Sequence, residues 1–409
     1  MFRRRRTPVT QPLEHRLLLT ATFCLLAGGA VMVYSASSAR TLLEGSGNGT
    51  AYLVKYVAYG AVGLVCMHLL SRRGLEAVRK ATPLLLLASF GMLLAVLIPG
   101  LGVEVNGARR WLGAGPVQFQ PAEVMKLALV LHAASVIALR PKLTRDLRDL
   151  IGPVLMPGAG AIALVFLQPD LGTALVIAFT LASMLLVAGV PIRHLLVAAA
   201  AGAVVVMVFA LMEPYRRARL TAFLNPWADA GDTGFQSVQA QIAFGSGGAF
   251  GVGPGQSVQK IFYLPEAHTD FILAVIGEEL GVAGIVCLLF LYGMIAYAGP
   301  RTAKAAKGIY AKLLASGLTS LILCQALLNV YAVLGLAPLT GVPLPFISSG
   351  STSLIVLLCA MGLLLNIAGG GSAHLRAITH DESNEDRDRS RRDRGTRGPG
   401  DRSRGRAAS

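Results

Sequence analysis

The chain has 409 residues, of which 54% are hydrophobic and only 14% are charged, and its formal net charge is +15. Soluble domains carry about 25% charged residues, so this composition excludes a water-soluble globular protein. The basic excess does not indicate nucleic-acid binding, because most of it flanks apolar runs, where Lys and Arg anchor membrane proteins. All five cysteines lie within apolar runs, namely Cys24, Cys66, Cys287, Cys324 and Cys359. Neither a disulfide framework nor a zinc-binding spacing is evident.

Long apolar runs dominate the chain, and a run of about 20 such residues crosses a bilayer as a helix. Ten runs have this character, at 16–38, 52–70, 81–99, 117–139, 151–168, 171–190, 194–212, 271–297, 312–335 and 350–369. We therefore predict an all-α, polytopic integral membrane protein. Its membrane domain spans 16–370 and contains about ten transmembrane helices.

The placement of Lys and Arg predicts the orientation, because these residues concentrate on the cytoplasmic side. With the N-terminus inside, the inner segments hold 28 of the 37 Lys and Arg residues. Residues 1–15 are then a cytoplasmic N-terminal tail, and 213–270 form a long extracytoplasmic loop before the eighth helix. Residues 371–409 are rich in Arg, Asp, Ser and Gly without apolar periodicity, which predicts a disordered basic cytoplasmic tail.

Charged residues in or near the first predicted spans are candidate site residues, because a charge inside a membrane is costly. Arg109 and Arg110 lie on the outer side, where arginine can bind a diphosphate bidentately or anchor the chain at the headgroups. Glu123 and Lys126 are three residues apart on one helix face and can form an ion pair, with either a cavity role or a structural one. Asp170 lies in a predicted turn, where it serves the site or caps the next helix.

The stretch 234–281 joins a glycine-rich loop to a long apolar run through one aspartate, Asp270. We interpret Asp270 as functional, with a helix N-cap as the alternative. Residues 234–243 predict a short amphipathic helix at the membrane surface. The glycines at 245–255 do not match a phosphate-binding loop, so we expect them to permit close approach to a bulky substrate.

Two pairs of polar residues near the later spans complete the candidates. Glu278 and Glu279 are adjacent on the predicted helix and point about 100° apart, so they cannot face the same partner. Ser348 and Ser349 lie in the proline-containing outer loop 341–350, where they bind substrate or cap the final helix.

Five blocks in order resemble one known family: NGARRWL at 106–112, QPAEVMKLAL at 120–129, QPDLGTA at 168–174, SVQKIFYLPEAHTDFI at 257–272 and GVPLPFISSG at 341–350. The chain is similar to the SEDS proteins (shape, elongation, division and sporulation), which are bacterial peptidoglycan glycosyltransferases. The block at 257–272 and VYSAS at 33–37 look more like the division-type branch, FtsW, than the elongation-type branch, RodA.

The resemblance implies an inverting transfer that polymerises lipid II into β-1,4 glycan strands. Asp270 matches the family's catalytic aspartate and would act as the general base. Glu123, Lys126 and Asp170 match polar positions that line the family's central cavity. The other candidate contacts to substrate or diphosphate are Arg109, Arg110, Arg216, Lys260, His268, Thr269, Ser348 and Ser349.

The resemblance also implies partners and a location. We expect a class B penicillin-binding transpeptidase and other divisome membrane proteins as partners, in the bacterial cytoplasmic membrane at the division septum. A divalent cation, Mg²⁺ or Mn²⁺, is a candidate for neutralising the diphosphate, and no organic cofactor is expected. A lipid II flippase, an elongation-type polymerase and a non-catalytic scaffold remain as alternatives.

Overall fold

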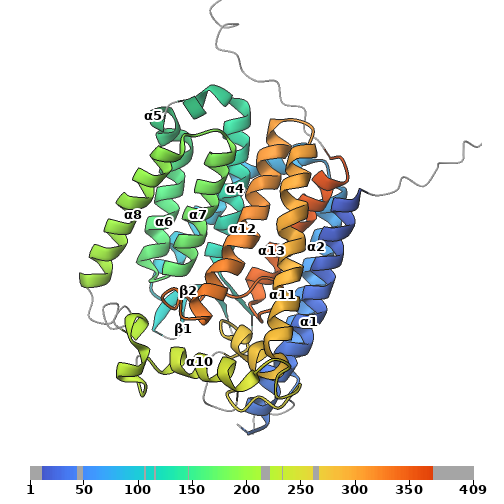
Figure 1. Cartoon of the computed structure of the whole chain (residues 1–409). Coiled ribbons are helices and arrows are strands. Elements are labelled where there is room, and N and C mark those ends of the chain that lie inside the picture. The colour runs from blue at the N-terminus through green and yellow to red at the C-terminus, as the bar shows by residue number, and fades with distance from the viewer. Residues whose placement is uncertain are drawn as a thin grey trace, which may run out of the picture.

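The computed structural model describes residues 12–43, 49–105, 107–114, 117–145, 147–212, 222–232, 234–260 and 267–371. Figure 1 shows a bundle of long, roughly parallel helices, with β1, β2 and α10 gathered at one end and α5 at the other. We call the end with β1, β2 and α10 the outer end, because the predicted extracytoplasmic loop lies there. Most of the two predicted tails, 1–15 and 371–409, lies outside the described residues, namely 1–11 and 372–409.

The bundle is formed by helices that run between its two ends. They are α1 (Leu13–Leu43), α2 (Ala51–Arg72), α3 (Leu75–Leu97), α4 (Pro121–Leu139), α5 (Leu147–Leu150), α6 (Met156–Leu167), α7 (Leu171–Val187), α8 (Ile192–Met212), α11 (Ile272–Ala305), α12 (Ile309–Val333) and α13 (Ser351–Ala368). A π-helical segment, Ile151–Leu155, joins α5 to α6, so that these pieces make one crossing. The 3₁₀-helices Pro141–Arg145 and Pro226–Asp229 and the helix α10 (Phe235–Gly247) lie in the connections.

The apolar helices confirm the polytopic membrane fold. Eight helical segments in the described part of the chain are long and apolar enough to cross a membrane, and α7 and residues 192–204 of α8 are shorter apolar helices. Most of the apolar stretch of α4, α12 and α13 is buried within the protein, at 72%, 67% and 78%, whereas no other long span exceeds 39%. Most side chains in the apolar stretches of these three central helices therefore face protein and not lipid.

A small antiparallel sheet at the outer end was not predicted from the sequence. Its strands β1 (Gly102–Val105), β2 (Ala108–Ala114) and β3 (Val117–Phe119) are paired in chain order. The fourth span consequently begins at Pro121 and not at residue 117 as predicted. A short apolar run such as Val117–Phe119 cannot be assigned to helix or strand by periodicity alone.

α11 is interrupted one third of the way along its length by Gly281, whose backbone has φ 65° and ψ −160°. The glycine-rich loop docks its backbone at this break. The N–H groups of Val252 and Gly253 donate to the carbonyls of Glu278 and Glu279 at 2.9 and 3.1 Å. Broken helices are tolerated in membranes where other protein groups bond the freed backbone, as this loop does.

The same loop also accepts hydrogen bonds from α11 beyond the break. Val282 and Ala283 donate their N–H groups to the carbonyls of Gly248 and Ala249 at 3.0 and 3.1 Å. A Cβ added at Gly281 would lie 2.7 Å from the carbonyl carbon of Ala249, which leaves no room for a side chain. The glycines therefore permit close approach of the loop to α11, and the expected close approach to a substrate is not needed to explain them.

α10 confirms the predicted helix at 234–243 and extends it to Gly247. Figure 1 shows it lying across the outer end of the bundle, at a steep angle to the crossing helices. Its Val238, Ala240 and Ala243 are buried, whereas Ile242 remains partly exposed. One face of α10 therefore covers the outer end of α11, and the other is free to meet the membrane surface.

Candidate active site

Asp270 lies on a half-buried turn that leads directly into α11. The N-cap residue of α11 is Phe271, and no side-chain hydrogen bond caps this helix, so Asp270 is not its N-cap. The Asp270 carboxylate faces the loop 341–350, since its Oδ2 lies 3.4 Å from the position that a Cβ would take on Gly341. Gly341 has φ 68°, a backbone conformation that suits glycine.

Asn329 on α12 joins the Asp270 turn to the loop 341–350. Its Nδ2 donates to the carbonyl of Asp270 at 2.8 Å and to the carbonyl of Val342 at 2.7 Å. The Asn329 side chain is buried, and its two amide hydrogens satisfy one main-chain acceptor on each segment. The Asp270 backbone is thereby fixed relative to Gly341.

Ser348 and Ser349 also join the loop 341–350 to the Asp270 turn by hydrogen bonds. Ser348 Oγ donates to the carbonyl of Thr269 at 2.6 Å and accepts from the N–H of Leu344 at 2.8 Å. Ser349 donates both its hydroxyl and its N–H to the carbonyl of His268, at 2.9 and 3.1 Å. Both hydroxyls therefore hold the main chain beside Asp270, and the predicted cap of the final helix is not formed, since Gly350 is the N-cap of α13.

His268 is buried on the side of the turn that meets α2. Its ring packs on the ring of Tyr52, with centroids 4.2 Å apart and planes tilted by 55°. Thr269 is half-buried next to it, and its carbonyl accepts a hydrogen bond from the Ser348 hydroxyl. Both residues thus lie at the site, where their main-chain carbonyls are already engaged by the two serines.

A buried polar chain supports the loop 341–350 from inside the bundle. Lys126 Nζ lies 2.8 Å from Glu123 Oε1 and 2.8 Å from Gln325 Oε1. Gln325 Nε2 in turn donates to the carbonyl of Pro343 and to Ser353 Oγ, both at 3.1 Å. The predicted ion pair is confirmed, and its side chains are at most 2% exposed. The second oxygen of Glu123, Oε2, is buried without a partner in the described chain.

Asp170 caps the N-terminus of α7, which was one of the two roles predicted for it. Its Oδ1 accepts the N–H of Thr173 at 3.0 Å, and its Oδ2 accepts the Thr173 hydroxyl at 2.9 Å. Gln120 Nε2, just before α4, donates to the same Oδ2 at 3.1 Å. The carboxylate is 3% exposed and links the starts of α4 and α7.

The arginines of the outer end have protein partners in this structure. Arg109 Nε lies 3.2 Å from Glu104 Oε2 across the β1–β2 pair, with the Arg109 side chain 47% exposed. Arg110 Nε donates to the carbonyl of Gln168 at 3.1 Å, and its Nη2 donates to the carbonyl of Pro169. Arg110 therefore holds the turn that contains Asp170, while Arg109 remains accessible. Arg216 lies outside the described residues.

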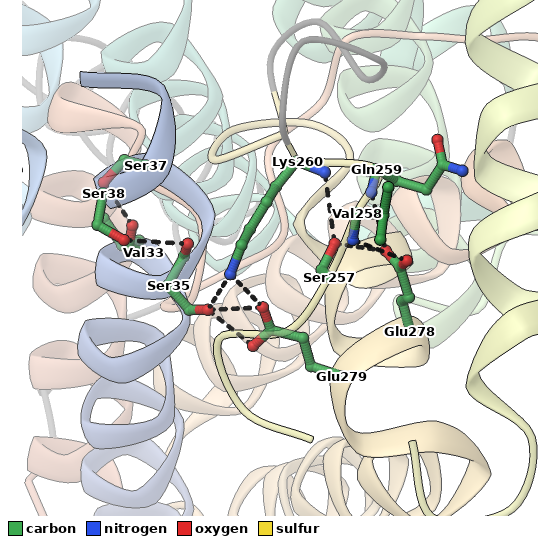
Figure 2. A network of polar contacts seen from close by, with 10 residues as sticks. All are labelled: Val33, Ser35, Ser37, Ser38, Ser257, Val258, Gln259, Lys260, Glu278 and Glu279. Carbon is green, nitrogen blue, oxygen red and sulfur yellow. Dashed lines mark hydrogen bonds and ion pairs between the residues drawn. The ribbon is translucent and has the colours of Figure 1, made fainter. Parts of the chain in front are cut away.

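Lys260 takes part in a buried network between the outer loop, α1 and α11, which Figure 2 shows. Its Nζ lies 2.8 Å from Glu279 Oε1 and 3.1 Å from Ser35 Oγ. The Ser35 hydroxyl lies 2.7 Å from both carboxylate oxygens of Glu279. Lys260 is 4% exposed, so this structure places it in a structural ion pair rather than at an open substrate surface.

Glu278 has a separate set of partners, as its direction on the helix predicted. The Ser257 hydroxyl donates to Glu278 Oε2, and the N–H groups of Val258 and Gln259 donate to its two carboxylate oxygens at 3.1 and 3.4 Å. Figure 2 shows Glu278 turned toward the loop and Glu279 turned toward α1. Both acids lie just before the break at Gly281, and both fasten the segment that leads to Asp270.

Comparison with known proteins places the chain in a family. Residues 15–371 match the profile of the FtsW, RodA and SpoVE cell cycle proteins, which covers nearly all of the described bundle. The chain belongs to the SEDS family. It is a multi-pass membrane protein of that family, and eight helices in the described part of the chain are long and apolar enough to cross a membrane.

Curated relatives span almost the same length as this SEDS protein. The chain is 41% identical over 355 residues to a probable peptidoglycan glycosyltransferase FtsW of Nitrosococcus halophilus, covering 86% of this chain and 91% of the relative. It is 38% identical over 352 residues to the stage V sporulation protein E of Bacillus subtilis, covering 86% and 96%. Division and sporulation members are thus similarly related to it.

Solved structures share the fold. A chain from a peptidoglycan synthase complex, described as coordinating polymerization and crosslinking, superposes with a TM-score of 0.72 at 31% identity, covering 88% of this chain and 98% of that chain. The rod shape determining protein RodA of Thermus thermophilus superposes with a TM-score of 0.64 at 29% identity, covering 90% and 99%.

Sequence reasoning missed two residues on α12 of this SEDS chain that organise the site. Gln325 and Asn329 are four residues apart, so they share a helix face, and both side chains are almost completely buried. Two amides at this spacing in an apolar run were a usable signal, because a buried amide needs hydrogen-bond partners. Gln325 bonds to the Glu123–Lys126 pair and Asn329 to the Asp270 turn.

The described residues do not form a metal site of their own. No group of three or more His, Cys, Asp or Glu side chains is placed to hold an ion in the part of the chain that the structure describes. Mg²⁺ commonly binds through one or two carboxylates together with substrate phosphates, which is a different arrangement. The expected Mg²⁺ or Mn²⁺ therefore stays a prediction.

Proposed function

We propose that this SEDS peptidoglycan glycosyltransferase polymerises lipid II with Asp270 as the general base. The observation that carries the proposal is the placement of the Asp270 carboxylate. It lies at the outer end of the bundle, half-buried, on a turn whose main chain is held by Asn329, Ser348 and Ser349. A fixed carboxylate at the mouth of a membrane bundle can accept a proton from a lipid-anchored alcohol.

In the proposed reaction, the acceptor sugar's hydroxyl oxygen on lipid II attacks the anomeric carbon of the donor glycan. A new C–O bond forms in the β-1,4 configuration, and the bond between that carbon and undecaprenyl diphosphate breaks, with the electron pair leaving on the diphosphate. The hydroxyl proton passes to Asp270. An alcohol is a poor nucleophile until a base removes this proton, and a positioned base contributes about 10²–10⁴-fold to the rate.

The leaving diphosphate gains negative charge and needs a cationic partner. We assign Arg109 this role, because it lies at the outer end, its side chain is 47% exposed, and Glu104 is its ion-pair partner among the residues that the structure describes. Arg110 has the supporting role of holding the Gln168–Pro169 turn beside Asp170. A divalent cation bound with the substrate's phosphates would add to this charge.

We further propose that the enzyme acts in septal synthesis with a class B penicillin-binding transpeptidase, with both termini in the cytoplasm. The motifs at 257–272 and 33–37 support the division type. The partner proposal is supported by the likeness to a chain of a peptidoglycan synthase complex. Complementation of division-depleted cells, but not of elongation-depleted or sporulation-deficient cells, is the expected result.

Polymerisation is tested with the purified protein, its transpeptidase partner and labelled lipid II. The expected product is a ladder of glycan strands on a gel, which a muramidase degrades to disaccharides. Movement of labelled lipid II across liposome membranes without any polymer would instead favour the flippase alternative. Omitting Mg²⁺ and Mn²⁺ in a parallel reaction tests the cation, since a lower rate is expected after chelation.

A further inference from the structure

A cavity of about 810 Å³ lies at the end of the bundle opposite to Asp270. It is bounded by the start of α1, the turn between α2 and α3, and the end of α13. By the orientation predicted from Lys and Arg, this end lies at the cytoplasmic leaflet. Cavities of about 300–1,000 Å³ are of the size that holds a small molecule or a lipid headgroup.

The lining of this cavity is divided by chemistry. Its polar part contains His15, His68, Arg72 and Arg73, and no Asp or Glu is among the lining residues. Neither arginine forms an ion pair with another residue that the structure describes, whereas the neighbouring Arg79 and Arg301 are each paired with a glutamate. The cavity therefore presents uncompensated positive charge.

The apolar part of the lining faces toward the membrane interior along α1 and α2. It includes Leu19, Phe23, Leu64 and Met67. Phe23 lies about two helical turns deeper than His15 on α1, and its side chain is 47% exposed. A ligand that matches both parts must have an anionic head and an apolar chain.

Hydrogen bonds between α13 and the turn that joins α2 to α3 hold the polar end of the cavity together. Asn366 on α13 donates its Nδ2 to three carbonyls of the α2–α3 turn, those of Leu70, Ser71 and Arg73, at 3.0, 2.9 and 2.6 Å. This bonding shields carbonyls that would otherwise repel an anion. His15 also lines the cavity, and its buried Nδ1 has no hydrogen-bond partner in the described chain, so a ligand could supply one.

We propose that this cavity binds an anionic phospholipid of the cytoplasmic leaflet. The phosphate lies between Arg72, Arg73 and the two histidines, and an acyl chain runs over Phe23 and Leu64. Arginine suits a phosphate because its planar guanidinium can donate two parallel hydrogen bonds. The site is separate from the proposed active site, which lies at the outer end.

Fluorescence quenching tests this site in the full chain. With Trp111→Phe, Trp227→Phe and Phe23→Trp, the chain carries one tryptophan at the cavity. We reconstitute it in phosphatidylcholine vesicles that contain a minor fraction of brominated lipid. Brominated phosphatidylglycerol should quench this tryptophan more strongly than brominated phosphatidylcholine does, and the comparison uses one and the same folded protein.

Charge variants locate the binding to the cavity. Arg72→Gln and Arg73→Gln should each reduce the preference for phosphatidylglycerol by about fivefold, the factor expected for one basic residue at an anionic surface. The control carries Lys304→Gln, which removes one positive charge at the same end, outside the cavity lining. It should keep the full preference.

Three outcomes would overturn the proposal. Equal quenching by the two brominated lipids would show that the cavity does not select an anion. Relief of quenching by soluble glycerol phosphate would show that a free phosphate, and not a lipid, is the ligand. A preference that appears only after removal of residues 372–409 would show that this acid-containing tail is the natural occupant.

Discussion

At the scale of single residues, Glu123 and Lys126 form one of two almost completely buried ion pairs among the described residues, the other being Glu279 with Lys260. The ions of the Glu123–Lys126 pair are 2.8 Å apart, and Lys126 extends the contact to Gln325 and so to the loop beside Asp270. Removing one partner of a buried pair leaves an uncompensated charge, whereas replacing both can be nearly neutral. The pair therefore allows its structural role to be separated from any cavity role.

We expect Lys126→Ala to destabilise the protein by about 3–5 kcal/mol, because it leaves Glu123 charged in an apolar interior. The measurement is the thermal unfolding midpoint in detergent, with the exposed Lys304→Ala on α11 as control. The double variant Glu123→Gln with Lys126→Met should recover the midpoint. If it also recovers polymerisation, the pair is structural; inactivity at a normal midpoint would indicate a cavity role.

Asn329 should affect the rate of catalysis, because it holds the Asp270 main chain in place. Asn329→Ala removes the donors to the carbonyls of Asp270 and Val342, and each unsatisfied buried acceptor costs about 1–3 kcal/mol. We expect a lower kcat with a smaller change in the apparent KM for lipid II, because the base is displaced while most substrate contacts stay. Ser316→Ala, a change at a partly exposed position on the same helix, should leave both constants unchanged. Equal kinetics for the two variants would contradict this role of Asn329.

At the scale of elements, the break in α11 is the feature that brings the outer loop to the bundle. Four hydrogen bonds between the glycine-rich loop and α11 bridge the break, and Glu278 and Glu279 fasten the following segment beside it. The loop is thus part of the folded core at the outer end. Its docking fixes where the chain can re-enter the membrane through Asp270.

Gly281→Ala tests this docking. The backbone at Gly281 has a positive φ, and a Cβ there would overlap the main chain of Ala249, so we expect a loss of about 1–3 kcal/mol. Gly293→Ala is the matched control, because Gly293 lies on the same helix with no atom within 4 Å of an added Cβ. Thermal unfolding in detergent compares the two. An equal midpoint for both variants would argue against the docked loop.

The sequence predicted the elements whose signal is local and strong. The ten apolar runs needed only length and hydropathy, and the two opposite charges within the fourth run marked Glu123 and Lys126 as an interior ion pair. It did not predict the strands at 102–119, because their short apolar segments match helix and strand patterns equally. It also did not predict the break at Gly281, since one glycine in an apolar run is common.

The sequence predicted which residues form the candidate site better than it predicted which residues they contact. Asp270 and Glu123 stood out as isolated charges beside or within apolar runs, which a single sequence can show. The partners of Lys260 come from α1 and α11, far away in the chain. Only the folded structure brings Ser35, Lys260 and Glu279 together, so the sequence suggested a substrate contact where the structure has an internal ion pair.

At the scale of the whole molecule, the orientation in the membrane decides which end is exposed to lipid II. The charge distribution predicts that the end with β1, β2 and α10 is extracytoplasmic. A reporter fused after Asp232 should therefore read as extracytoplasmic, and one fused after Lys307 as cytoplasmic. The measurement uses an alkaline phosphatase and a green fluorescent protein fusion at each position. Both positions reporting from one side would contradict the ten-span topology.

The most direct test of the account is the rate of lipid II polymerisation by the purified protein with its partner, comparing Asp270→Asn with Asp232→Asn. Asparagine nearly preserves the size of Asp270 but cannot accept the hydroxyl proton, so we expect the rate to fall by about 10²–10⁴-fold. Asp232 is exposed in the same outer region, and its variant should polymerise at the parent rate. Polymerisation at the parent rate by a folded, partner-bound Asp270→Asn protein would contradict the assignment of Asp270 as the base.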